Sequence, residues 1–103
     1  MGHPLLEVKD PATKEKLYCV WSTVCDAPLT DFMPLEQFKS FYREWLKERR
    51  LEQAVTDYQD FEWQLEKGCA FRMSQSDAVH SNRAGDNDKR LTLKKLIEEY
   101  RAK

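Results

Sequence analysis

The sequence predicts a single α+β domain, in which a small two- or three-stranded sheet is covered by a helical hairpin or one long helix and closed by a C-terminal helix. Residues 1–34 contain runs in which side chains alternate between two faces, as in strands, and these runs are separated by turn signals. Residues 35–67 repeat apolar side chains at three- and four-residue spacing, and the whole chain of 103 residues is too short for two independent domains. We therefore expect one domain, completed by a short strand, a loop and a helix over residues 68–103.

Residues 1–34 predict a β-hairpin followed by a loop. The first strand is expected at residues 4–8, and residues 10–13 read Asp-Pro-Ala-Thr, a turn signal because proline fixes φ and aspartate bonds the backbone ahead. The second strand is expected at residues 17–24. Bulky side chains alternate onto both of its faces, which is typical of a central strand covered on two sides. A loop over residues 25–33 leads to the first helix.

Residues 35–67 give the strongest periodic signal in the chain. Pro34 stands where the first turn of a helix tolerates proline. The apolar stripe that follows comprises Leu35, Phe38, Phe41, Tyr42, Trp45 and Leu46. A second stripe from Leu51 predicts a helix that ends at Gly68, a C-cap residue. Whether the chain bends at Arg49 and Arg50 or continues as one helix stays open at this point.

The C-terminal third predicts three short features. Residues 69–73 form a strand candidate that returns beside the first strands. Ser76 is expected to cap a short helical turn that stops near Gly85, followed by an exposed connection at residues 86–88. Thr92 is the expected N-cap of the last helix. Its apolar stripe comprises Leu93, Leu96, Ile97 and Tyr100.

Large apolar side chains supply the expected core. We expect four of them to be buried: Trp21, Phe38, Trp45 and Leu96. The chain holds three Trp, four Tyr and five Phe, and each buried ring removes about 150–250 Å² from water. So many rings in a small chain leave open a hydrophobic patch or a homodimer face.

The cysteines and the hydropathy pattern indicate a cytoplasmic protein. Cys19, Cys25 and Cys69 cannot all pair with one another, so we expect all three to be free, as in a reducing compartment. The sequence has no run of about 18 apolar residues and no secretory signal pattern. We therefore expect no membrane span.

No constellation of residues predicts catalysis. An enzyme acting through Cys25 or His80 is the least favoured alternative, because nothing in the sequence brings a base beside a thiol. The scattered cysteines lack the paired spacing of zinc sites, and the three glycines form no phosphate-binding loop. We expect no catalytic residue, metal or cofactor.

Charge distribution carries the main functional signal. Residues 51–67 contain one basic and five acidic residues, whereas residues 68–103 contain eight basic and five acidic ones. Lys94 and Lys95 follow the expected Thr92 cap, where positive charge opposes the helix dipole. Together with Lys89 and Arg90 they form a candidate site for an anion or for a partner's carboxylate. The alternative is a solvated surface.

Four short patterns carry a resemblance over most of the chain. They are residues 18–28 (YCVWSTVCDAP), 42–44 (YRE), 82–85 (NRAG) and 90–93 (RLTL), with Glu36 and Phe38 on the first helix. In this order they resemble small bacteriophage and prophage proteins of uncharacterised function. The resemblance implies an origin but no activity or catalytic residue. Met33-Pro34 departs from the pattern, because such proteins more often carry a Ser or Thr cap there.

These observations favour a non-catalytic protein that binds a macromolecular partner, expected to be a protein. The alternative is a nucleic-acid-associated protein that uses Lys89, Arg90, Lys94 and Lys95 on the phosphate backbone. A pI near 6.1 argues against the alternative, because dedicated nucleic-acid binders usually carry a basic balance.

Overall fold

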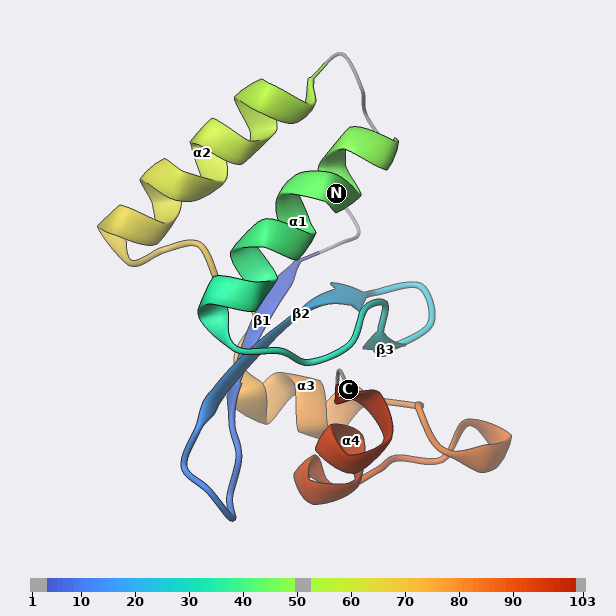
Figure 1. Cartoon of the computed structure of the whole chain (residues 1–103). Coiled ribbons are helices and arrows are strands. Elements are labelled where there is room, and N and C mark those ends of the chain that lie inside the picture. Colours follow the sequence, from blue (N-terminus) through green and yellow to red (C-terminus); the bar gives the residue numbers. More distant parts are fainter. Residues whose placement is uncertain (1–3, 50–52, 102–103) are drawn as a thin grey trace.

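The computed structural model describes residues 4–49 and 53–101 and has the predicted α+β architecture (Figure 1). The strands of the described chain are β1 (Leu5–Lys9), β2 (Lys16–Ser22) and β3 (Ala27–Pro28). Its α-helices are α1 (Leu35–Arg49), α2 (Ala54–Lys67), α3 (Gln75–Ser81) and α4 (Leu93–Tyr100), and a 3₁₀ turn, η1, covers Asp86–Asp88.

Strand β2 is the centre of an antiparallel sheet of order β1-β2-β3. Leu6 lies opposite Cys19 in the β1–β2 pair, and Trp21 lies opposite Pro28 in the β2–β3 pair. Residues 17–21 of β2 are all buried. This confirms the prediction of a central strand covered on two sides.

Alternate residues of β2 enter two different cores. Leu17, Cys19 and Trp21 join a core with α3 and α4, which includes Ala78 and Leu96. In Figure 1, α3 and α4 lie on one side of the sheet and the α1–α2 pair lies on the other. The second core is made by Leu5, Tyr18, Val20, Met33, Phe38, Phe61 and Ala70. The fold is therefore a sheet between two helical layers.

The helical region is a hairpin of two helices. The sequence left open whether the chain bends at Arg49 and Arg50 or continues as one helix. Arg50 and the start of the second stripe at Leu51 lie outside the described residues, but α1 and α2 on either side of them pack against each other. Helix α2 ends at Gly68, as predicted. Gly68 has a φ of 79°, and the N–H of Cys69 donates to the Gln64 carbonyl at 2.9 Å. Such a left-handed cap favours glycine.

Strand β1 and the start of β2 lie within one residue of the sequence prediction, and larger differences occur at two places. Strand β2 ends at Ser22 rather than at residue 24, because the Ser22 hydroxyl accepts from the Cys25 N–H and Asp26 adopts a positive φ of 53°. The turn brings β3 from the expected loop into the sheet. The strand candidate at residues 69–73 is wrong as a strand: it makes a single parallel bridge, between Met73 and Leu6.

The caps of the last two helices follow the same local chemistry. Helix α3 is capped by Ser74 instead of Ser76, because the Ser74 hydroxyl accepts from the Asp77 N–H at 3.0 Å, and it ends before Gly85, at Ser81. Thr92 caps α4, as predicted. Its hydroxyl accepts from the Lys95 N–H at 3.3 Å.

The core prediction is confirmed for three residues and wrong for one. Trp21, Phe38 and Leu96 are buried, with at most 1% of each exposed. Trp45 is only half-buried. Leu46 takes the buried position at this turn of α1, which places Trp45 at the edge of the stripe, stacked on Tyr42 with ring centroids 5.8 Å apart.

This difference in burial predicts unequal costs of truncation. We expect Phe38→Ala to lower the free energy of unfolding by about 3–5 kcal/mol, as for large aromatic truncations in cores. Trp45→Ala should cost about 1–2 kcal/mol, because the ring already keeps part of its surface in water. Urea unfolding followed by circular dichroism measures both. Trp63→Ala serves as a control, since Trp63 is 59% exposed. Equal losses of unfolding free energy in Trp45→Ala and Phe38→Ala would contradict the placement of Trp45 at the edge of the core.

Candidate functional site

A groove of about 480 Å³ lies between the α1–α2 hairpin and the start of β1. We call it the aromatic groove. Its apolar lining includes Tyr42, Trp45 and Phe61, and its charged lining comprises Arg49, Asp57, Asp60 and Arg72. The volume lies within the range of ligand-binding clefts, about 300–1,000 Å³.

Helical spacing builds the aromatic side of the groove. Tyr42 and Trp45 stand three residues apart on α1, and Arg49 follows one turn later, with its guanidinium carbon 4.8 Å from the centre of the Trp45 ring. Phe61 of α2 meets Tyr42 edge-on, with centroids 4.9 Å apart. Burial, reinforced by the nearby Asp57 carboxylate, raises the pKa of Tyr42. The Tyr42 hydroxyl is therefore a hydrogen-bond donor at neutral pH.

The charged lining comes from three separate segments. Arg49 ends α1, Asp57 and Asp60 lie on α2, and Arg72 follows α2 on the segment that leads to α3. Both Arg72 and Asp60 are exposed. Within residues 4–49 and 53–101, neither of these two side chains forms an ion pair. The groove thus combines aromatic surface with charges of both signs.

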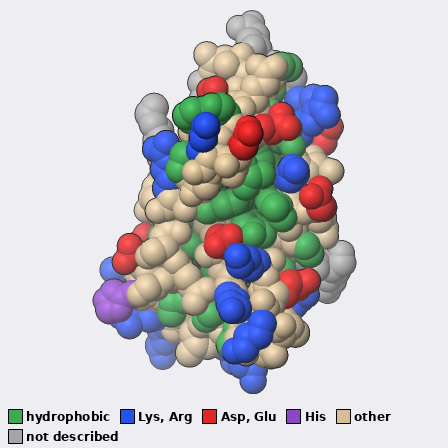
Figure 2. Space-filling model, turned by 90° about the vertical axis from the view of Figure 1, so that its left-hand side faces the viewer, with side chains coloured by type: hydrophobic (Ala, Val, Ile, Leu, Met, Phe, Trp, Pro, Cys, Tyr) green, Lys and Arg blue, Asp and Glu red, His purple; other side chains and the backbone are tan. Residues whose placement is uncertain are grey.

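Apolar surface continues beyond the groove. Ala70 lines the groove and also a second hollow of about 240 Å³, whose other lining includes Tyr18, Leu65 and Phe71. Figure 2 shows hydrophobic side chains visible in the middle of one face of the molecule, with Lys and Arg side chains gathered in its lower part.

The predicted basic cluster is solvent-exposed, and part of it is already engaged within α4. Lys89, Arg90, Lys94 and Lys95 are all exposed. The Thr92 hydroxyl already accepts from the Lys95 N–H, and the Lys95 ammonium lies 3.6 Å from a Glu98 carboxylate oxygen. One first-turn donor and one cation are therefore already engaged within α4. The role of the cluster in binding stays a prediction.

A buried asparagine fixes the segment that carries this cluster. Asn82 is 2% exposed and follows α3. Its amide group donates to the carbonyls of Val79 at 2.6 Å and Leu91 at 2.9 Å, and its side-chain oxygen accepts from the Leu91 N–H at 2.7 Å. Buried polar groups stabilise a fold only when satisfied in this way. Asn82 therefore joins the end of α3 to the start of α4.

The cysteines are the other candidate residues from the sequence. All three cysteines are free, as predicted. Cys19 is buried, and burial raises the pKa of its thiol, so it is held as an unreactive core residue. In the described part of the chain, no three His, Cys, Asp or Glu side chains are grouped to hold a metal ion. No described helix has the length and apolarity needed to cross a bilayer.

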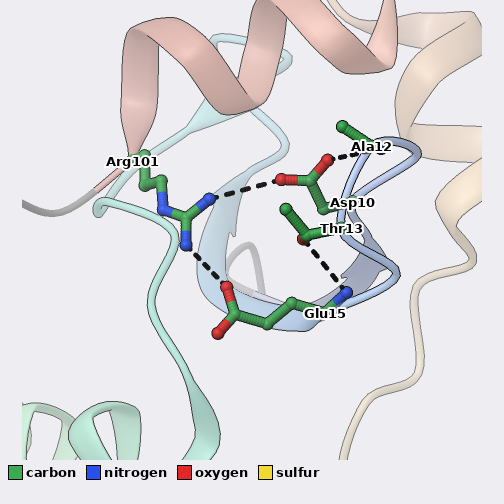
Figure 3. Close-up of polar contacts among 5 residues, drawn as sticks. All are labelled: Asp10, Ala12, Thr13, Glu15 and Arg101. Atoms are coloured by element: carbon green, nitrogen blue, oxygen red, sulfur yellow. Dashed lines mark hydrogen bonds and ion pairs between the residues drawn. The ribbon is translucent and has the colours of Figure 1, made fainter.

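A polar clasp joins the C-terminal end of α4 to the β1–β2 turn (Figure 3). One guanidinium nitrogen of Arg101 lies 3.3 Å from Asp10 Oδ2, and the other lies 2.6 Å from Glu15 Oε1. The other Asp10 oxygen accepts from the Ala12 N–H at 2.8 Å, as predicted for this turn. The clasp therefore holds α4 against the sheet.

Comparisons with known proteins identify no relative. No protein-family model matches the chain, and no curated protein or solved structure matches it.

Sequence reasoning missed the aromatic groove because its lining comes from segments far apart in the chain. The basic cluster was visible because its four residues fall within seven positions. One signal did point to the groove. Trp45 lies beside Leu46 in the stripe, and adjacent side chains on a helix point about 100° apart, so one of the two lies nearer the edge of the stripe.

The clasp predicts an acid-sensitive contribution to stability. The Ala12 N–H, assisted by the Arg101 charge, lowers the pKa of Asp10 below its ordinary value of 3.8. A lowered carboxyl pKa stabilises the fold above the ordinary value, and the stabilisation is lost as pH falls through the lower one. We expect Asp10→Asn to destabilise the protein at pH 7 and to flatten the loss of unfolding free energy below about pH 4. Asp31→Asn, at an exposed position, is the control. If Asp10→Asn lost unfolding free energy below about pH 4 as steeply as the unsubstituted chain, this role would be contradicted.

Proposed function

We propose that this chain is a non-catalytic, cytoplasmic binding protein that recognises a protein partner through the aromatic groove. The origin implied by the sequence resemblance, a bacteriophage or prophage, belongs to the same proposal. Under it the chain acts as a small accessory or host-directed factor.

The observation that carries this proposal is the composition of the groove. Protein interfaces combine a buried aromatic centre with a polar rim, and Trp, Tyr and Arg supply most of their binding energy. Trp45 and Tyr42 are both half-buried, so a partner can remove the rest of their surface from water. Arg49, over the Trp45 ring, adds a cation to the same site.

Nucleic acid is the weaker candidate for a partner. The basic cluster that would follow a phosphate backbone contains Lys95, whose charge is paired with Glu98. Asp86 and Asp88, also exposed, precede the cluster directly. Acidic groups beside the cations oppose the approach of a polyanion. We therefore favour the aromatic groove over the basic cluster as the binding site.

Site-directed photo-crosslinking in the host cells tests the proposal. A photoreactive amino acid at Gln64, which lines the groove, should cross-link to a discrete protein. The matched position is Gln59, on the same helix but lining the opposite side of the hairpin. Adding Trp45→Ala should reduce the Gln64 product about tenfold or more, as for an interface hot spot.

Two results would contradict the proposal. One is the absence of any cross-linked protein from Gln64. The other is an equal yield of the same products from Gln59, which would indicate nonspecific contact with α2.

A further inference from the structure

We propose that the occupant of the aromatic groove is a second copy of this chain, related to the first by a two-fold axis. This inference rests on the proposed function, because it names the partner of the same groove. It also commits two of the exposed groove charges, Arg72 and Asp60, to pair with each other across the interface.

The charge balance of the groove carries the inference. A two-fold interface brings one surface patch against an identical patch, so the patch must be complementary to itself. The groove is lined by two arginines and two aspartates. A purely acidic partner would meet the two carboxylates, and a purely basic one would meet the two guanidinium groups. A partner carrying both signs in equal number matches best, and another copy of the groove is such a surface.

Arg72 and Asp60 are the pair best placed for this contact. They come from different segments, so they present opposite charges at separate points of the lining. Both are exposed, and in the described part of the chain neither is engaged in an ion pair. In a two-fold dimer, Arg72 of each copy meets Asp60 of the other, which gives two equivalent ion pairs.

Two partly exposed aromatic rings supply the apolar part of the interface. Tyr42 and Trp45 pack against the second core but stay half-buried. A standard interface covers about 800 Å² on each partner. That area is a modest share of the 6919 Å² surface of the chain, and it exceeds the groove itself, so the proposed interface also includes the flanking surface of α1 and α2.

Charge reversal with cross-rescue tests the inference. Sedimentation equilibrium of the full chain, over about 1–500 μM, should show a monomer–dimer equilibrium. Arg72→Asp alone and Asp60→Arg alone each place like charges at both ion pairs, so each should weaken dimerisation about tenfold or more. An equimolar mixture of the two variants should recover the dimer, because each heterodimer then has two opposite-charge pairs.

Sedimentation equilibrium of a control variant tests specificity, and circular dichroism checks that each variant is folded. Arg90→Asp makes the same change of charge in the exposed basic cluster and should leave the dimer unchanged. The double variant Arg72→Asp with Asp60→Arg should also dimerise as the unsubstituted chain does. A chain that unfolds cannot give this rescue, so recovery excludes misfolding as the cause of the single-variant losses.

The outcomes separate this inference from the proposed function. A monomer at all concentrations, with Gln64 cross-linked to a different protein, would overturn the second copy and leave the groove as a binding site. A monomer without any Gln64 product would overturn both. A dimer that the mixed variants fail to restore would overturn the Arg72–Asp60 pairing and with it this interface.

Discussion

The register of β2 is the constraint on which the other elements depend. A shift of one residue would exchange Leu17, Cys19 and Trp21 with Tyr18 and Val20 between two cores of different shape. Since residues 17–21 are all buried, neither face of the strand tolerates the exchange. The indole N–H of Trp21 finds no hydrogen-bond partner among the described residues, a cost of about 1–3 kcal/mol. Burying the ring, at about 25 cal/mol per Å² over about 200 Å², contributes more than that cost.

The same constraint shapes the candidate site. Each half of the molecule must cover one face of a narrow sheet, and on the α1–α2 side most of that cover is aromatic. Eight aromatic residues meet in this core, of which only Tyr18, Phe38 and Phe61 are buried. The other five remain partly in water. The groove is therefore a consequence of packing large rings from a hairpin onto a sheet that cannot cover them all.

The features that sequence reasoning predicted depend on residues near one another in the chain. The alternation of β2, the stripe of α1 and the caps at Gly68 and Thr92 all arise from local spacing and backbone chemistry. Other features depend on distant contacts. Strand β3 forms because the turn at Asp26 folds two residues back onto β2. Choosing Ser74 over Ser76 as a cap, or Leu46 over Trp45 as the buried residue, requires the position of each helix relative to the sheet.

The candidate site likewise has features that the sequence shows and features that only the structure shows. The basic cluster could be read from adjacent residues, but the engagement of Lys95 with Glu98 and with the Thr92 cap appears only in three dimensions. The groove needs α1, α2, Leu5 of β1 and the segment around Ala70 at once. Partner and origin remain proposals, because they depend on molecules other than this chain.

Native-state hydrogen exchange tests the central claim that β2 couples both cores into one cooperative unit. The measurement compares the unsubstituted chain with Leu96→Ala, a truncation in the core on the α4 side. If β2 couples the cores, opening free energies should fall by the same amount at Tyr18, whose N–H donates to Met33, and at Phe38, whose N–H donates to Pro34 on the far side of the sheet. Unchanged protection at Phe38, with loss only in α3 and α4, would show that the two cores open independently and would contradict the account.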